Sequence, residues 1–425
     1  MRTIAIVGSG IAGDEAARAA RKTDPKASIV MLTEESHSLY SACVLPDYVA
    51  GEIPRQRVFL RTPEAYAQEG IELLLDHPVV EWSPDRQLLH LRDRDLHYDG
   101  LVMATGSRAV IPPLPGVEKE GVITLKTLSD ADRILEAQGT DAVVVGSGPL
   151  GVEVALALRR RGWTVRIVEL LERVLPQLFD NPVADLLKLR LEEHGIRVFL
   201  GEQVLEIIGG TRPEGLRTDQ QTLKADLVVF VIGMRPEVTL GEEGGLALGS
   251  SGGIRVDEYM RTSLRGVWAC GDCVESRDRL TRHQGLFMLW NNARLQGRVA
   301  GSNAAGGNSH YSGSLNITTV NVGDLAAASM GQIAADLPDG KTRLLQRQGP
   351  WGAFCLVMRE GVLAGVQALG RTERVGGLLG LLLKGGNLQG RLIEKVSSKG
   401  GWETWALRGV RRELIQLLER DVKSD

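Results

Sequence analysis

The stretch VGSGIAGDEAA, from Val7 to Ala17, recurs as VGSGPLGVEVA from Val145 to Ala155. Both copies read Val-Gly-Ser-Gly-x-x-Gly-x-Glu-x-Ala, and each follows an apolar run that is typical of a buried strand. A strand that enters a helix through G-x-G-x-x-G is the fingerprint of dinucleotide binding. One copy alone is weak evidence, whereas two copies in the same context predict two dinucleotide sites.

Each glycine of the repeat has a separate physical role. The first makes a tight turn, the second lets a pyrophosphate approach the backbone, and the third lets the helix pack closely on the strand. The helix N-terminus then offers its free N–H groups to the phosphates. The expected cofactor-binding glycines are Gly8, Gly10 and Gly13 in the first copy and Gly146, Gly148 and Gly151 in the second.

An acidic residue ends the strand that follows each repeat. Glu34 follows the run from Ser28 to Thr33, and Glu169 follows the run from Val165 to Val168. A carboxylate at this position accepts hydrogen bonds from a free ribose hydroxyl and repels a 2′-phosphate. Both residues are therefore expected to bind ribose, and Glu169 predicts a preference for NADH over NADPH.

The composition excludes several classes of function. A chain of 425 residues is long enough for two or three domains, and a net charge of −3 gives no footprint for nucleic acid. No apolar run approaches the roughly 20 residues that span a bilayer, and the N-terminus lacks a signal-peptide pattern, so a cytoplasmic location is expected. Only Cys270 and Cys273 of the four cysteines lie close together, so no metal or iron–sulfur centre is expected in the chain itself.

The segments around the repeats indicate where domains begin and end. The proline-rich run from Ile111 to Gly116 closes the first unit, and the second unit ends in Gly233-Met234-Arg235-Pro236. The pattern of the first unit resumes at Gly253 and leads to a long helix, expected from about Leu286 to Ala305. From about Tyr311 strand-like segments follow, and an amphipathic tail helix is expected at 413–422.

Taken in order, these residues resemble the FAD-dependent pyridine nucleotide–disulfide oxidoreductase superfamily. The resemblance rests on both repeats with their acids, and on the motifs Ala104-Thr105-Gly106, Gly233-x-Arg235-Pro236 and Ala269-Cys270-Gly271-Asp272. It implies an α/β fold with two Rossmann-like dinucleotide-binding domains, the NAD domain inserted in the FAD domain, and a C-terminal α+β interface domain. The implied segments are 1–112 and 245–310 for FAD, 113–244 for NAD and 311–425 for the C-terminal domain.

The resemblance also implies roles for single residues toward FAD and NAD(H). Glu34 is expected to bind the adenosine ribose of FAD, and Asp272 its ribityl or pyrophosphate region. Glu153 is expected near the nicotinamide, although an acid so early in a helix also has a simple electrostatic explanation. The long helix after Asp272 is expected to aim its N-terminus at the flavin, where its dipole stabilises negative charge. Further expected cofactor contacts are Ala104, Thr105, Gly106, Gly233 and Gly271.

Branches of the superfamily differ in their electron acceptor, and Cys43 separates them. The segment 38–46 is expected to be a loop, and its Cys43-Val44-Leu45-Pro46 resembles the single-cysteine loop of coenzyme A disulfide reductases and NADH oxidases or peroxidases, where the cysteine is catalytic. Ile11 stands where the oxidase and peroxidase branch has an active-site His, which argues against peroxide reduction. Cys270 and Cys273 have the thioredoxin-type spacing, but Asp272 between them matches the flavin motif, so this pair is expected to be incidental.

Tyr40-Ser41 instead resembles the same loop in nitrite reductase flavin regions and redoxin reductases. Together with Cys43-x-Leu45-Pro46, it also resembles the flavin subunits of anaerobic aldehyde or 2-oxoacid oxidoreductases. This favours a chain that moves hydride between NAD(H) and FAD and exchanges electrons with a separate iron–sulfur protein or subunit, as a homodimer or in a hetero-oligomeric complex. The alternative is a self-contained, Cys43-dependent NADH:disulfide or persulfide reductase. A non-catalytic, NADH-sensing flavoprotein is disfavoured because every motif of the hydride path is present.

Overall fold

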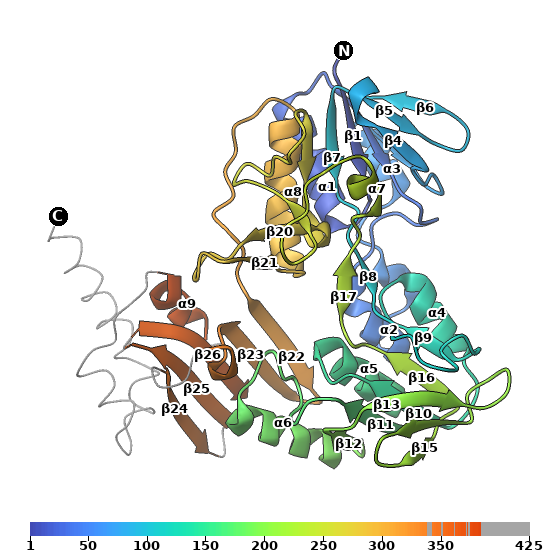
Figure 1. Cartoon of the computed structure of the whole chain (residues 1–425), viewed down its shortest axis with the longest axis vertical. Helices are drawn as coiled ribbons and strands as arrows, with labels where there is room; N and C mark the ends of the chain where they lie inside the picture. The colour runs from blue at the N-terminus through green and yellow to red at the C-terminus, as the bar shows by residue number, and fades with distance from the viewer. Residues whose placement is uncertain (338–341, 350–351, 361, 371, 373–374, 384–425) are drawn as a thin grey trace, which may run out of the picture. The chain divides into compact units, whose positions relative to one another are not determined.

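The computed structural model describes residues 1–337, 342–349, 352–360, 362–370, 372 and 375–383 (Figure 1). The tail helix expected at 413–422 lies outside the described residues. The chain divides into two compact units, each made of two stretches of sequence. Unit 1 comprises Met1–Leu170 and Gly195–Leu315, and unit 2 comprises Leu171–His194 and Asn316–Asp425.

The first sheet of unit 1 grows from the first glycine repeat. Its strands pair in parallel in the order β19-β7-β1-β2-β3. They are β1 (Thr3–Val7), β2 (Ser28–Leu32), β3 (Ile71–Leu74), β7 (Gly100–Met103) and β19 (Val267–Ala269). The inner strands are buried almost throughout, which explains why they read as continuous apolar runs rather than as alternating patterns.

The second sheet of unit 1 grows from the second repeat. Its strands are also parallel, in the order β12-β11-β10-β16-β9. They are β9 (Val122–Thr124), β10 (Asp141–Val145), β11 (Thr164–Glu169), β12 (Arg197–Leu200) and β16 (Leu227–Phe230). All five precede β19 in sequence, so one Rossmann-like sheet is inserted in another. The fold class expected from the sequence is confirmed, while the division at residues 112, 244 and 310 stays a prediction.

Helices α1 (Ile11–Thr23) and α8 (Trp290–Ala304) pack side by side next to the first sheet (Figure 1). A Cβ added to Gly297 or Gly301 of α8 would collide with the carbonyl oxygen of Ala12 or Ala16 of α1. The two helices therefore touch backbone to backbone, and the small residues of α8 are required by this contact.

Smaller elements complete unit 1. The antiparallel sheets are β4 (Glu81–Ser83), β5 (Leu88–His90) and β6 (Asp95–His97); β13 (Val204–Ile208), β14 (Gly215–Thr218) and β15 (Thr222–Lys224); and the crossing pair β8 (Ser107–Ala109) with β17 (Met234–Pro236). A mixed sheet joins β18 (Ile254–Arg255), β20 (Val274–Arg277) and β21 (Gln284–Leu286). The remaining helices are α2 (Leu45–Ala50), α3 (Pro63–Gln68), α4 (Leu128–Glu136), α5 (Pro149–Arg160) and α7 (Thr239–Glu243).

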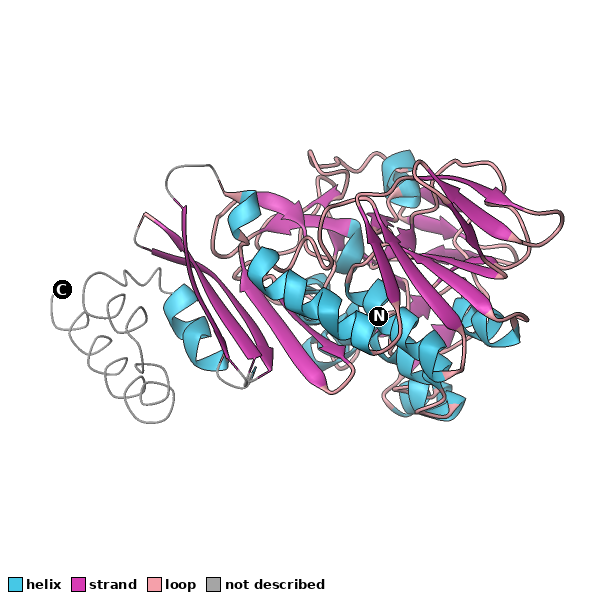
Figure 2. Ribbon diagram, turned by 90° about the horizontal axis from the view of Figure 1, so that it is seen from below, coloured by secondary structure: helices cyan, strands magenta, loops and turns pink. Residues whose placement is uncertain are grey.

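Unit 2 is built on one antiparallel sheet in the order β22-β23-β26-β25-β24. Its strands are β22 (Ile317–Val322), β23 (Leu325–Gly331), β24 (Thr342–Gly349), β25 (Gly352–Arg359) and β26 (Val362–Gly370). Helix α6 (Asn181–Glu193) packs on β22, β25 and β26, and α9 (Gly376–Leu383) packs on β26 (Figure 2). Asp180, just before α6, accepts a 2.6 Å hydrogen bond from the side chain of Gln367.

Two local expectations are wrong in part. The helix expected from Leu286 begins at Trp290, because Leu286 pairs with Glu275 in the β20–β21 ladder. The segment 38–46, expected to be a loop, contains a 3₁₀ turn at Ala42–Val44 and runs into α2. A proline in the first turn and Gly51, with φ of +79°, bound that helix, as proline and glycine commonly do.

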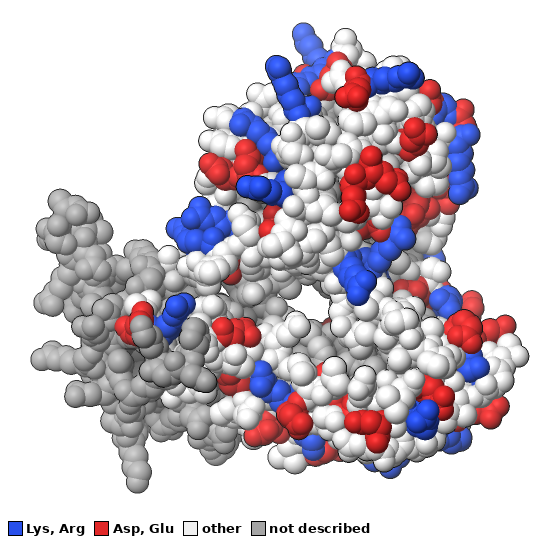
Figure 3. Space-filling view, viewed as in Figure 1, with Lys and Arg blue, Asp and Glu red and all other residues white. Residues whose placement is uncertain are grey.

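No helix among the described residues is long and apolar enough to cross a membrane. On the face shown in Figure 3, basic and acidic side chains are interspersed, as expected for a chain whose net charge is only −3.

Candidate active site

The protein itself requires the first and third glycines of both repeats. Gly8 has φ of +112° and Gly146 has φ of +101°, a region that favours glycine. A Cβ on Gly13 would collide with the carbonyl oxygen of Gly8, and a Cβ on Gly151 would collide with that of Gly146. These positions therefore shape the turn and seat the helix against the strand.

The middle glycines have a different explanation. A Cβ on Gly10 or Gly148 would meet no atom of the described residues within 4 Å, and both have φ of −65°, which any residue adopts. Each is the N-cap of a helix, α1 or α5. Because no neighbouring protein atom forbids a side chain here, the open space before each helix N-terminus fits a pyrophosphate.

The two expected ribose acids lie at the ends of their strands, in different surroundings. Glu34 follows β2 and is exposed to solvent. Glu169 ends β11 and is buried, and its Oε2 accepts hydrogen bonds from the amide of Ser147 at 2.8 Å and from its hydroxyl at 2.7 Å. Glu169 is thereby fixed against the second glycine turn.

The residues after β7 and β19 meet next to the first turn. Thr105 donates a 2.6 Å hydrogen bond to the carbonyl of Glu237. Asp272 accepts a 2.8 Å hydrogen bond from the hydroxyl of Ser107, and its Oδ2 lies 3.3 Å from Nζ of Lys126. Positive φ values mark Gly106 and Gly271 in these loops, and Gly233 in the loop after β16. A Cβ on Gly8 would collide with the carbonyl oxygen of Ala104.

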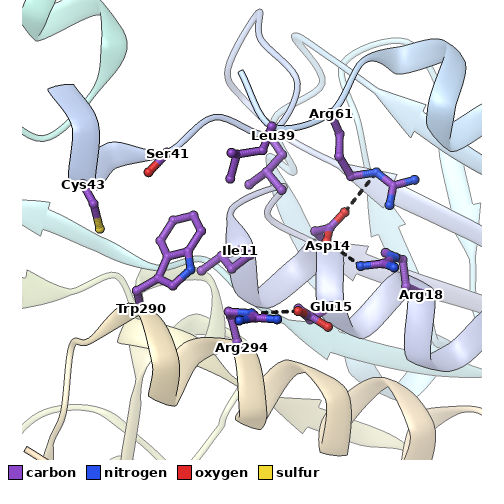
Figure 4. Close-up of a pocket in the computed structure, with 11 residues that line it drawn as sticks. Ile11, Asp14, Glu15, Arg18, Leu39, Ser41, Cys43, Arg61, Trp290 and Arg294 are labelled. Carbon is purple, nitrogen blue, oxygen red and sulfur yellow. Dashed lines mark hydrogen bonds and ion pairs between the residues drawn. The ribbon is translucent and has the colours of Figure 1, made fainter. Parts of the chain in front are cut away.

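A pocket of 660 Å³ lies between α1, residues 40–48 (the Cys43 segment) and the first turns of α8 (Figure 4). Cys43 and Trp290 lie at one end, and a cluster of acids and arginines lies at the other. Its lining residues are Ile11, Asp14, Glu15, Arg18, Leu39, Ser41, Cys43, Leu60, Arg61, Trp290 and Arg294. The first turn of α8 therefore faces the same pocket as Cys43.

The polar end of the pocket is a network of arginines and carboxylates, in which Arg18 and Arg61 also pair with Glu69. Asp14 accepts a 2.9 Å hydrogen bond from the hydroxyl of Tyr66, and its Oδ1 lies 3.4 Å from Nε of Arg61. Arg294 donates a 2.9 Å hydrogen bond to Glu15. The lining counts three arginines against two carboxylates, and burial raises the pKa of Asp14. Each of the three arginines thus contacts at least one carboxylate.

Cys43 and Glu153 are brought together although 110 positions separate them. Helix α2, which follows Cys43, packs on α5, which carries Glu153. The Cys43 side chain is exposed within the pocket, yet the pocket walls and the charge of Glu153 raise its pKa. Burial and the nearby carboxylate of Asp47 raise the pKa of Glu153 to about 7. Glu153 therefore changes protonation state near neutral pH beside a thiol whose own pKa is raised.

The other cysteines are placed differently. Cys270, Cys273 and Cys355 are free and buried, and burial raises the pKa of each thiol. Cys273 Sγ lies 3.3 Å from the carbonyl oxygen of Cys270. Among the described residues, no three His, Cys, Asp or Glu side chains are grouped so as to hold a metal ion.

Reasoning from sequence missed the polar end of the pocket and its aromatic wall. Asp14 and Glu15 lie within the first repeat, but Arg61 and Arg294 belong to no motif. Trp290 is the first residue of α8, whereas the sequence pattern predicts that this helix begins at about Leu286. Only the chain's tertiary fold brings these segments together.

Residues 2–297 match the family model described as pyridine nucleotide-disulphide oxidoreductase. The chain belongs to this family. It is accordingly an NAD(P)H-dependent flavin oxidoreductase that binds FAD and NAD(H), and the two glycine turns described above fit two such dinucleotides.

Individual relatives differ in their named activity. An NADH oxidase of Methanocaldococcus jannaschii is 34% identical over 345 residues, covering 79% of this chain and 77% of the relative. The epsilon subunit of NADH-dependent phenylglyoxylate dehydrogenase from Aromatoleum evansii is 31% identical over 341 residues, covering 79% and 80%. The solved structure of an NAD-dependent persulfide reductase from A. fulgidus has a TM-score of 0.85 and 29% identity, covering 90% of this chain and 77% of that one.

Proposed function

We propose that the chain is an NADH-linked, FAD-dependent reductase in which the Cys43 thiol reduces a disulfide or persulfide substrate. One observation carries this proposal: an exposed thiol lies in a 660 Å³ pocket whose far end is rich in arginine. A small sulfur compound fits within such a pocket, beside the thiol. The sequence alone favours electron exchange with a separate iron–sulfur partner. The pocket at Cys43 supports the alternative, in which the Cys43 thiol reacts with the substrate.

In the proposed reaction the Cys43 thiolate attacks one sulfur of the substrate. The S–S bond breaks, a mixed disulfide forms between Cys43 and one half, and the other half leaves as a thiolate that takes up a proton. FAD, when bound, would supply two electrons taken as hydride from NADH, and Cys43 would regain its thiol as the second half leaves as a thiol. In sum, one disulfide, one NADH and one proton give two thiols and NAD⁺.

Two acids support this assignment. Glu153, whose pKa is raised to about 7, is suited to hold or release a proton beside Cys43. Glu169, held by Ser147, would accept a hydrogen bond from a ribose hydroxyl and repel a 2′-phosphate. We therefore propose NADH as the preferred nucleotide, and a higher kcat/KM for NADPH in steady-state assays would overturn that preference.

A second candidate function is electron exchange with a separate iron–sulfur protein or enzyme subunit. Its support is the A. evansii relative, which is named as a subunit of an NADH-dependent dehydrogenase and is matched over 80% of its length. The chain would then act within a hetero-oligomeric complex. Cys43 would line the pocket without taking part in the transfer.

One experiment separates the two candidates. NADH-dependent reduction of a viologen dye and of coenzyme A disulfide or polysulfide is measured with the wild type and with Cys43→Ser, at matched FAD content. Thiol chemistry predicts equal dye reduction and a loss of sulfur reduction of at least roughly 100-fold in the variant. Equal dye reduction with no sulfur reduction by either protein favours the second candidate, whose partner is then sought by co-purification.

A further inference from the structure

Two tyrosines flank Cys43, and both contact the same helix of the inserted sheet. The hydroxyl of Tyr40 accepts a 3.3 Å hydrogen bond from the amide of Leu128. The hydroxyl of Tyr48 donates a 2.8 Å hydrogen bond to Oδ1 of Asp132. Leu128 and Asp132 are four positions apart in α4, so they lie on one face of that helix, one turn from each other.

The first contact uses a backbone group that α4 cannot satisfy itself. Leu128 is the first residue of α4, and the first N–H groups of a helix have no intrahelical partner. The side chain of Thr127 caps the amide of Asp130 instead. Burial and the charge of Glu35 raise the pKa of Tyr40, so its hydroxyl stays neutral at this helix end.

The second contact is reinforced by charge. Nη2 of Arg55 lies 3.0 Å from Oδ2 of Asp132, while Tyr48 bonds the other oxygen. Both partners hold the pKa of Asp132 below its usual value, although burial opposes them. A carboxylate that accepts from a hydroxyl and a guanidinium makes stronger hydrogen bonds than a neutral acceptor does.

Helix α2, which begins at Leu45 between the two tyrosines and ends at Ala50, also contacts α5 and its C-cap residue. Helix α2 packs on both α4 and α5, and Nη1 of Arg161 lies 3.4 Å from the carbonyl oxygen of Val49. Both helices flank β10, the strand of the second repeat. The segment that follows β2 of the first sheet is thus fastened to helices of the second.

We propose that α4 is the frame that positions the Cys43 thiol. Tyr40 and Tyr48 tie the two ends of the Cys43 segment to Leu128 and Asp132, so the inserted dinucleotide-binding sheet sets the location of the thiol. Asp132 is a positioning residue in this arrangement, and its relevance to turnover rests on the proposed thiol chemistry of Cys43.

The test measures the thiol directly in the full-length, FAD-loaded protein. Cys43 alkylation by iodoacetamide is followed by mass spectrometry in the wild type, Asp132→Ala and Tyr48→Phe. Both variants are expected to react about two- to tenfold faster, because loss of one such hydrogen bond shifts a local equilibrium by that factor and loosens the walls around the thiol. Asp132→Asn, which keeps an acceptor for Tyr48, is expected to restore most of the wild-type rate.

Further measurements separate positioning from general stability. NADH-dependent dye reduction and Tm are expected to change little in Tyr48→Phe, because this variant retains the aromatic ring. It also tests the proposal if Asp132→Ala fails to fold. Glu52→Gln is the matched control, because it breaks only the exposed pair with Arg160 beside α2; its alkylation rate is expected to equal that of the wild type.

Two outcomes would overturn the proposal that α4 positions the Cys43 thiol. In one, alkylation is unchanged in both Asp132→Ala and Tyr48→Phe; in the other, alkylation, dye reduction and Tm all shift together. Neither outcome depends on whether Cys43 is catalytic. Failure of the proposed function would show instead in the turnover of Cys43→Ser.

Discussion

At the scale of single residues, the ionisation of Glu153 affects the pKa of the Cys43 thiol. Above about pH 7 Glu153 is ionised, and its negative charge raises the pKa of Cys43. Glu153→Gln removes that charge, so the thiol pKa falls and the thiolate fraction at pH 8 increases. We expect Cys43 alkylation at pH 8 to be about two- to fivefold faster in Glu153→Gln than in the wild type.

The same variant supplies its own control at lower pH. At pH 5.5 Glu153 is protonated in the wild type as well, so the two proteins are expected to react at equal rates. A pH–rate profile of alkylation from pH 5 to 9 tests this. A constant ratio across that range would show that the glutamate acts through packing rather than charge.

The glycines of the first repeat separate cofactor binding from folding. In Gly10→Ala the new methyl meets only open space in the protein, so the fold is expected to persist while FAD affinity falls at least about tenfold. In Gly13→Ala the methyl collides with the carbonyl oxygen of Gly8, so Tm itself is expected to fall. FAD titration and thermal unfolding distinguish the two, and normal flavin affinity in Gly10→Ala would argue against a pyrophosphate there.

Individual elements differ in how well the sequence predicts them. The strand–turn–helix units of both repeats were predictable because the glycine spacing and the apolar strands are local signals. Helix α2 was not recognised, because its six residues are too few to show a helical period. The start of α8 was misplaced because the apolar run 286–289 fits a helix equally well, and only its pairing partner Glu275 assigns Leu286 to a strand.

The contact between α1 and α8 gives a prediction for whole elements. Gly301→Val places a branched side chain against the carbonyl oxygen of Ala16, and overpacking of this kind costs about 1–3 kcal/mol. Tm is expected to fall by roughly 2–5 °C, since unit 1 is large and each kcal/mol shifts the Tm of a large domain less than that of a small one. Leu295→Ala, on an exposed face of the same helix, is the control and is expected to stay within about 0.5 kcal/mol of the wild type. Equal Tm values for all three proteins would contradict the close helix contact.

For the whole molecule, the sequence predicted the class of fold but not the chemistry at its centre. Both sheets and the insertion followed from ordered motifs. The pocket did not, because Arg61, Trp290 and Arg294 come from segments that only the tertiary fold assembles. The roles assigned to Cys43, Glu153 and the other expected site residues stay predictions.

Because unit 2 is made of two stretches of sequence, removing the second stretch is expected to uncover α6 in the first. A chain of residues 1–315 keeps α6 but lacks β22, β25 and β26, on which α6 packs. The apolar side chains Val183, Leu187 and Leu191, buried in the complete chain, would lose that cover and promote aggregation. We expect this truncated chain to sediment as large species, and Leu187→Lys with Leu191→Lys to raise its soluble yield. A monodisperse truncated chain would contradict the assignment of α6 to unit 2.

The insertion of one sheet in another also sets an order in time. Strand β19 pairs with β7 yet is translated roughly 160 residues later, after every strand of the second sheet. At about 5–20 residues per second, the growing chain carries an unpaired β7 edge for some 10–30 seconds. Such an edge is open to wrong partners. The first sheet is thus begun before any strand of the second sheet is translated, and it is completed only after the last of them, so the second sheet can form while the first still lacks a strand.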